Sequence, residues 1–171
     1  MKKTMFLLMI VALLCSCAST QFPDNADYTK TYLWEVSRYD STREPFISNS
    51  APGRFSNTAT AGDDMTAYIC YDGQHLYAKF LEYNSSWANN AVMQGYDLFI
   101  YRGEERALIT TVKCAGNAFP LDAKVFAELC KGGVLEFQFD GWGTVASNYS
   151  FTMDVTGFAY AAKTLFGTQD K

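Results

Sequence analysis

The chain has 171 residues, with 14 Lys and Arg against 18 Asp and Glu, and a formal net charge of −4 at neutral pH. This length suits one domain with a proper hydrophobic core. An acidic chain without a run of basic residues is a poor binder of nucleic acid, because neutralising phosphates requires clustered Lys and Arg, and it gains little from anionic lipid surfaces.

The first 16 residues have the pattern of a secretory signal peptide. Two lysines precede an almost unbroken apolar run from Met5 to Leu14, which is shorter than the about 20 residues that a transmembrane helix needs. The segment ends in Leu14-Cys15-Ser16-Cys17, which resembles the lipobox of bacterial lipoproteins. The resemblance implies cleavage after Ser16 and acylation of Cys17 by fatty acids such as palmitate, so that a lipid anchor holds the mature protein on a membrane.

Two alternatives bear on this processing site. An ordinary secretory signal with an unrelated cysteine is one, and lipidation of Cys15 is the other, although bulky Leu14 would then precede the cut. Ala18 favours the outer membrane, because the inner-membrane retention signal of some enterobacteria uses Asp at this position. Residues 17–30 are polar and predict a lipidated tether, which leaves 31–171 as the domain. Without the two signal-peptide lysines the net charge becomes about −6.

Aromatic residues, 16% of the chain, are favoured in strands, and Thr31–Ser37 is the first strand expected. Asp72-Gly73 between two β-rich runs is a strong hairpin signal. The expected strand pairs are 65–71 with 76–83, 92–101 with 106–113 around Gly103, and 134–139 with 149–155 around a Gly141-Trp142-Gly143 loop. Residues 48–64 are small and polar with Pro52-Gly53 in the middle, and they predict the longest loop.

Two segments have helical rather than alternating periodicity. Residues 122–131 carry apolar side chains at 125, 126 and 129, with Asp122 as the N-cap and two glycines at the end. Residues 156–166 place Phe158, Ala161, Ala162 and Leu165 on one face. The sequence therefore predicts a mainly β fold, an antiparallel β-sandwich with two short α-helices packed at one end.

The carboxy-terminal two thirds, about 100 residues from Met65 to Phe166, carry a recurring set of short motifs. These are Leu121-Asp122-Ala123 opening a helix, Lys131-Gly132-Gly133, the strands 134–139 and 149–155, Gly157-Phe158-Ala159, and a last helix with Ala161, Ala162 and Leu165. The set resembles the invasion-associated locus B family and its relatives among type VI secretion accessory proteins. That family also places cysteines as Cys70 and Cys114 stand here, whereas Cys130 and Asn117-Ala118 depart from its pattern. The resemblance implies a secreted β-sandwich without catalytic residues.

Three cysteines remain beyond the lipidation site, at positions 70, 114 and 130. An oxidising compartment favours disulfides. We expect Cys114 to pair with Cys130, since the two flank one connection and close a short loop, with a gain of about 3 kcal/mol in the loop-entropy model. Cys70 then stays reduced and buried in a strand, and the other pairings remain open because spacing does not fix connectivity.

The other residues that could carry chemistry have plain structural explanations. His75, the one histidine of the chain, is expected to be an exposed hairpin residue, because a lone turn histidine defines no catalytic group. A zinc site built from it and the three cysteines is disfavoured by the oxidising compartment. The acid pairs Asp63-Asp64 and Glu104-Glu105 are expected to be solvated surface rather than calcium ligands. We therefore expect no metal and no cofactor.

Trp87 and Trp142 are the candidate ligand contacts, because both lie in loop-like stretches. An aromatic side chain on a loop can stack on a sugar ring or anchor a protein partner. The alternative is that each ring folds back over the core. Trp34, in the first strand, is expected in the core.

These features favour an envelope lipoprotein that displays a non-catalytic interaction domain to a protein partner. The second hypothesis is a carbohydrate-binding module that uses the loop tryptophans. A hydrolase ranks last, because nucleophile and base cannot both be named.

Overall fold

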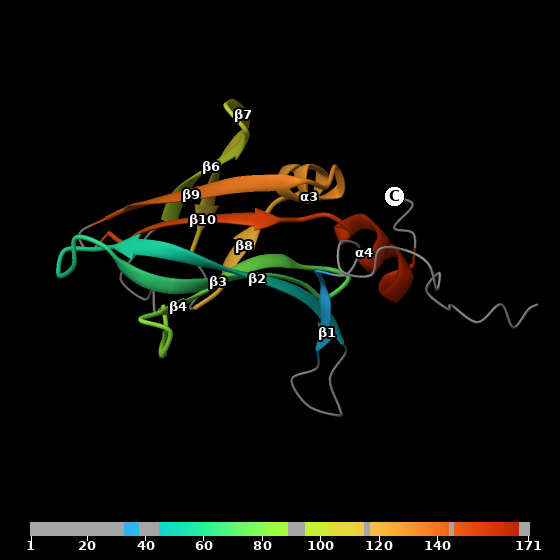
Figure 1. The fold of residues 1–171 in the computed structure, drawn as a ribbon, viewed down its shortest axis with the longest axis horizontal. Coiled ribbons are helices and arrows are strands. Elements are labelled where there is room, and N and C mark those ends of the chain that lie inside the picture. Colours follow the sequence, from blue (N-terminus) through green and yellow to red (C-terminus); the bar gives the residue numbers. More distant parts are fainter. Residues whose placement is uncertain (1–32, 38–44, 89–94, 115–116, 144–145, 168–171) are drawn as a thin grey trace, which may run out of the picture.

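The computed structural model describes residues 33–37, 45–88, 95–114, 117–143 and 146–167 (Figure 1). The expected signal peptide, Cys17 and the tether lie outside these residues. The described elements, in chain order, are β1 (Glu35–Ser37), β2 (Phe46–Ser56), β3 (Asp63–Tyr71), β4 (Leu76–Glu82), β5 (Ser86–Trp87), β6 (Gly95–Arg102), β7 (Glu105–Lys113), β8 (Phe119–Leu121), α3 (Ala123–Cys130), β9 (Val134–Trp142), β10 (Asn148–Asp154) and α4 (Phe158–Phe166).

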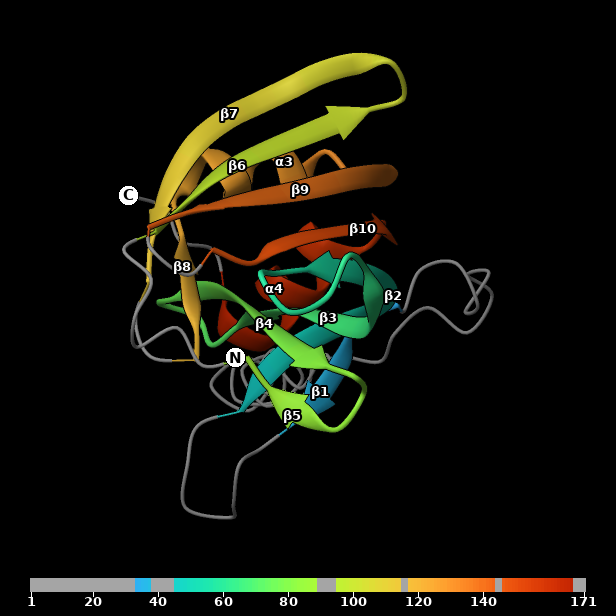
Figure 2. The same ribbon diagram turned by 90° about the vertical axis from the view of Figure 1, so that its left-hand side faces the viewer.

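All the strands belong to one antiparallel sheet, with the order β5-β4-β3-β2-β10-β9-β6-β7, while β1 pairs with β2 and β8 with β4. The predicted mainly β fold with two short helices is confirmed. Figure 2 shows how the sheet folds over into two layers, with β7, β6, β9 and β10 above and β2, β3 and β4 below. The layers are continuous because β2 pairs with β10. β8 continues the chain from the upper layer and pairs with β4 of the lower one.

The three predicted strand pairs are confirmed as β3–β4, β6–β7 and β9–β10. The turn after β3 is organised by Asp72, whose Oδ1 accepts hydrogen bonds from the backbone N–H groups of Gln74 (2.9 Å) and His75 (2.7 Å). Along β3, β4, β9 and β10, apolar side chains alternate into the space between the layers, whereas Val112 is the one buried residue of β7. Trp34 lies just before β1 and is buried in the core, as predicted.

The prediction of a loop over 48–64 is wrong, because β2 runs through Pro52 and Gly53 to Ser56. The small residues serve close strand packing. A Cβ added to Gly53 would lie 2.6 Å from the Ser150 carbonyl oxygen and 2.8 Å from Phe151 Cβ. Pro52 falls between the stretch of β2 that pairs with β1 and the stretch that pairs with β10, where a missing N–H is tolerated.

Both helices pack at one end of the folded sheet, as predicted (Figure 1). Asp122 caps α3 by accepting from the N–H groups of Lys124 and Val125. Phe158 begins α4 and is fully buried. Its ring lies 4.8 Å from Trp34, 5.1 Å from Phe126 and 5.9 Å from Tyr71, measured between centroids. This cluster joins the two helices to the sheet.

Candidate functional site

One corner of the sheet exposes aromatic side chains. Trp87 in β5 and Tyr83 in the turn before it expose 43% and 49% of their surfaces. The Trp87 ring lies 5.5 Å from the Tyr68 ring, and Lys79 Nζ lies 4.0 Å from the Trp87 centroid. Tyr68 and Lys79 are direct neighbours across β3 and β4, so the indole of Trp87 covers the outer face of both strands. We call Tyr68, Lys79, Tyr83 and Trp87 the aromatic corner.

The backbone of the aromatic corner has an unusual conformation. Tyr83 and Asn84 both have a φ of 52°, which residues other than glycine rarely adopt and which is typical of the central positions of a type I′ turn. Three hydrogen bonds hold the turn, from Ser85 N to Glu82 O (3.0 Å), from Tyr83 N to Asp64 O (3.0 Å) and from Thr66 Oγ1 to Asn84 Oδ1 (2.7 Å). Such backbone strain costs about 1–3 kcal/mol per residue and tends to cluster at functional positions. The turn therefore fixes the backbone at Tyr83, whose ring packs edge-on against Phe55 of the core at 4.9 Å.

Trp142 is placed differently from the prediction. It is the last residue of β9 rather than part of a loop, and it is half-buried. Its ring packs on Gly95 of β6, where an added Cβ would lie 2.6 Å from Trp142 Cζ2. Four strands separate β5 from β9 in the sheet order. The two tryptophans therefore do not share a patch on neighbouring strands.

The predicted disulfide between Cys114 and Cys130 is not formed, since Cys70, Cys114 and Cys130 are all free cysteines. Cys114 follows the end of β7 and Cys130 ends α3, with β8 between them in the chain. Cys70 is buried in β3, as expected. Burial raises the pKa of its thiol to about 11, so it is a weak nucleophile at neutral pH.

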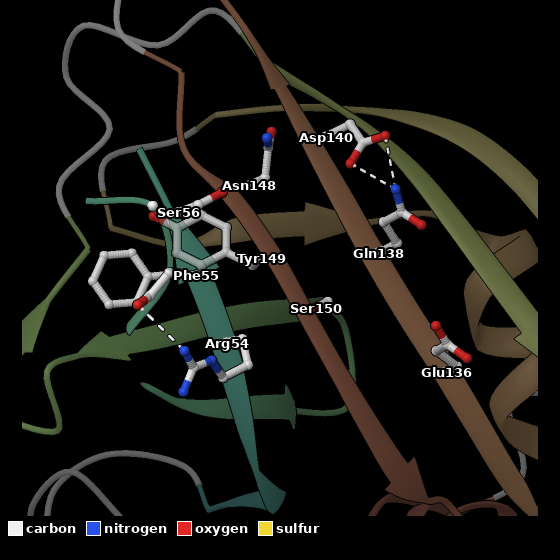
Figure 3. Close-up of a pocket in the computed structure, with 11 residues that line it drawn as sticks. Arg54, Phe55, Ser56, Glu136, Gln138, Asp140, Asn148, Tyr149 and Ser150 are labelled. Atoms are coloured by element: carbon white, nitrogen blue, oxygen red, sulfur yellow. Dashed lines mark hydrogen bonds between the residues drawn. The ribbon is translucent and has the colours of Figure 1, made fainter. Parts of the chain in front are cut away.

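A second feature, a polar hollow of about 480 Å³, opens on the outer face of β2, β10 and β9 (Figure 3). Seven polar residues from these strands line it: Arg54 and Ser56 of β2, Asn148 and Ser150 of β10, and Glu136, Gln138 and Asp140 of β9. They occupy neighbouring register positions, because Arg54 is opposite Ser150, and Ser150 is opposite Gln138. Phe55, Tyr149 and the residues Ala61-Gly62 complete the lining. We call this site the polar hollow.

Hydrogen bonds from the fold orient the planar side chains of the polar hollow. Gln138 Nε2 donates to both carboxylate oxygens of Asp140 at 3.0 Å. Asn148 Oδ1 accepts from the Gly141 N–H at 2.9 Å. Arg54 forms an ion pair with Asp64 at 2.7 Å, and its second terminal nitrogen lies 3.3 Å from the Gly62 carbonyl oxygen. Asn148 and Arg54 are thus bonded to the backbone of neighbouring residues, whereas Gln138 and Asp140 are bonded to each other.

The remaining residues considered in the sequence take structural positions. His75 is exposed and its Nδ1 lies 3.2 Å from Asp72 Oδ2 within the β3–β4 turn. Asp64 pairs with Arg54, and Glu104 and Glu105 lie exposed at the β6–β7 turn. Among the described residues, no three His, Cys, Asp or Glu side chains gather as a metal site would require. None of the described helices is long and apolar enough to cross a membrane.

Comparison with known proteins finds no matching family model, no matching curated protein and no matching solved structure. The resemblance to the invasion-associated locus B family therefore stays a prediction. Sequence reasoning identified Trp87 but missed Tyr83 and the whole polar hollow. The alternation of polar residues at 136, 138 and 140 could have predicted one outward-facing wall of the hollow. The pairing of β2 with β10, which supplies the other wall, has no local signal in the sequence.

Proposed function

We propose that the chain is a lipid-anchored envelope protein of the outer membrane, whose β domain binds a protein partner through the aromatic corner. The observation that supports this function is the exposed Tyr83 and Trp87 pair on a strained turn. Tyr83 and Trp87 expose 49% and 43% of their surfaces, and each packs on one neighbouring ring, Tyr83 on Phe55 at 4.9 Å and Trp87 on Tyr68 at 5.5 Å. Trp and Tyr are enriched among the residues that dominate binding energy in protein interfaces.

The geometry favours a protein partner over a glycan at this corner. A sugar platform built from both tryptophans would need them side by side, and the sheet separates them by four strands. The Trp87 ring is also engaged by the Lys79 ammonium and lies tilted against Tyr68 at 57°. Trp87 and Lys79 together form a ridge with an apolar body and a positive charge. Such a ridge suits insertion into a partner surface that carries acidic groups.

The anchor is tested by replacing the acylated residue. Cys17→Ser should move the protein from the membrane pellet to the soluble fraction, because an acidic domain has no electrostatic substitute for acyl chains worth about 0.8 kcal/mol per buried CH₂. Membranes washed with high salt and probed for the protein provide the measurement. Sedimentation of Cys17→Ser with membranes at the wild-type level would overturn the anchor.

The partner surface is tested by photo-crosslinking in intact cells. A photoreactive amino acid at position 87 should give one discrete adduct, and the same amino acid at Tyr160, an exposed aromatic position on α4, should not. Tyr83→Ala, combined with the probe at position 87, should reduce that adduct about tenfold, as expected for a hot-spot side chain. Equal adduct patterns at both positions, or insensitivity to Tyr83→Ala, would reject the aromatic corner as the interface.

A further inference from the structure

The polar hollow is separate from the aromatic corner and has chemistry of a different kind. Its lining comes from β2, β10 and β9, whereas the corner lies on β3, β4 and β5. Figure 3 shows Gln138 and Asp140 along β9, facing Asn148 and Ser150 of β10, with Arg54 across the hollow. Three of the planar groups, those of Arg54, Gln138 and Asn148, have hydrogen-bond partners within this face.

These side chains still have hydrogen-bonding capacity toward the hollow. Gln138 uses its amide nitrogen on Asp140, which leaves its carbonyl oxygen as an acceptor. Asn148 uses its oxygen on Gly141 N–H, which leaves its two N–H donors. Ser56 and Ser150 add hydroxyl groups, which both donate and accept. A ligand with many hydroxyl groups matches this mixture of donors and acceptors.

The charges of the polar hollow exclude other ligand classes. Arg54 is neutralised by Asp64, so Asp140 and Glu136 make the local charge negative. Phosphates and other anions are therefore disfavoured. Apolar ligands do not suit a wall of amide, carboxylate and hydroxyl groups, each of which would lose water without a new partner. Among the described residues, no cluster of three His, Cys, Asp or Glu offers a site for a metal cation.

An aromatic shelf adjoins the polar hollow on the next strand. Phe99 of β6 is the direct cross-strand neighbour of Gln138, and Tyr101 is that of Glu136. Side chains paired in this way on one face lie about 5 Å apart at their Cβ atoms. Both rings are half-buried, and the Arg106 guanidinium lies 5.6 Å from the Phe99 centroid and 5.7 Å from the Tyr101 centroid. Polar groups beside an aromatic ring are the combination that holds the hydroxyl groups and the C–H face of a sugar ring at once.

We infer that the polar hollow, together with Phe99, binds a neutral saccharide. Asn148 donates to ligand hydroxyl groups, Gln138 Oε1 and Asp140 accept from them, and Phe99 contacts the apolar face of the sugar. This site does not depend on the protein partner proposed above, and it differs from a platform of exposed tryptophans.

The test uses the full chain, purified from membranes in a detergent without a sugar headgroup. Neutral oligosaccharides of glucose, galactose, mannose and N-acetylglucosamine are titrated by calorimetry. At least one should bind with a Kd of about 1 mM or tighter. Asp140→Asn, which keeps the side-chain shape, Gln138→Ala and Phe99→Ala should each weaken that binding about tenfold or more. Two control variants should change the affinity less than about twofold: Thr152→Ala, an exposed position on β10 outside the lining, and Trp87→Ala at the aromatic corner.

Four results would overturn this inference. They are no binding of any oligosaccharide at about 10 mM, unchanged affinity in Asp140→Asn and Gln138→Ala, loss of binding in Trp87→Ala, and competition by inorganic phosphate. The melting temperature of each variant shows whether a loss comes from unfolding. Because Gln138→Ala should leave the crosslink at position 87 intact, failure of the saccharide site and failure of the protein interface are separate outcomes.

Discussion

The two ends of the core are built from similar aromatic side chains but are stabilised in different ways. At the helix end, Phe158 meets Trp34, Tyr71 and Phe126 ring to ring. At the opposite end, Tyr96 and Tyr149 are just as deeply buried, and each also carries a hydroxyl group that must find a partner. The helix end has one such hydroxyl group, on Tyr71, which donates to the Gly73 carbonyl oxygen at 2.9 Å, whereas the opposite end links its hydroxyl groups in a chain of hydrogen bonds.

The hydrogen-bond chain at the opposite end joins hydroxyl groups to a carboxylate. The Tyr149 hydroxyl donates to Glu82 Oε1 at 2.6 Å. Burial and Glu82 raise the pKa of Tyr149, and side-chain hydrogen bonds with Ser147 and Tyr96 lower it. Glu82 is half-buried and ends the chain close to solvent. The buried phenol hydroxyl groups therefore have hydrogen-bond partners, and the Glu82 carboxylate accepts the last bond of the chain.

The comparison predicts that the largest loss of stability follows from truncation at the helix end. Phe158→Ala removes the ring that joins both helices to the sheet, and burial at 0% exposure leaves a cavity that helix α4 cannot easily close. The free energy of unfolding should fall by about 3–5 kcal/mol. Urea unfolding measures this change, with Tyr160→Ala on the exposed side of α4 as the control. An unchanged unfolding midpoint would mean that α4 does not dock on the sheet.

A smaller loss is expected at the opposite end, where the shape is kept and one hydroxyl is removed. Tyr149→Phe leaves the ring stack with Phe80 at 4.1 Å in place but removes the donor to Glu82 and the hydrogen-bond partner of Tyr96. The free energy of unfolding should fall by about 1–3 kcal/mol, the range for a buried polar group left without its partner. Tyr149→Phe in a Glu82→Gln background separates the two contributions. Equal losses in both backgrounds would show that the hydroxyl chain is not coupled.

The helix end was largely predictable from the sequence, and the opposite end was not. Apolar residues at helical spacing, Asp122 as a cap and Gly167 after α4 are local signals, and they located both helices. The Asp72-Gly73 turn likewise located the β3–β4 hairpin. The partners of Tyr149, by contrast, are Glu82 and Tyr96, which lie 67 residues and more than 50 residues away in the sequence. No local pattern marks a hydroxyl for such a contact.

The prediction for the β2 segment was wrong for a related reason. Its Ser, Asn, Ala, Pro and Gly residues have low strand propensity, and that propensity predicted a loop. In the fold these small residues allow β10 and β3 to approach closely on either side of Gly53, so tertiary packing outweighs the local preference. The polar hollow could not be predicted from local sequence for the same reason, because its walls come together only through the pairing of β2 with β10.

The smallest predicted effect separates the two ends by their response to pH. At the helix end, partial burial raises the pKa of Asp72, but hydrogen bonds from the backbone N–H groups of His75 and Gln74 and the contact with the His75 ring outweigh it and hold the pKa below its ordinary value. An unfolded chain then binds a proton to this carboxyl more readily than the folded one, so the turn contributes stability above about pH 4 and loses it as the pH falls through the folded pKa. Burial is the main cause that raises the pKa of Tyr96 and Tyr149 at the opposite end, and it also raises the pKa of Tyr71 at the helix end. The unfolded phenols lose their protons first, so stability is lost as the pH rises above about 10.

Melting temperatures measured from about pH 3 to about pH 11 should therefore fall on both sides. Asp72→Asn keeps an oxygen that can accept from the turn N–H groups, and it should flatten the acid side by a few degrees without changing the alkaline side. Tyr149→Phe should do the reverse, because it removes one buried phenol and leaves Asp72 untouched. His75→Gln is the control for the acid side, since it removes the imidazole but keeps the backbone N–H that Asp72 accepts. If Asp72→Asn left the acid side as steep as in the wild type, the acid loss would belong to other carboxylates and the turn would not be the pH-sensitive element of the helix end.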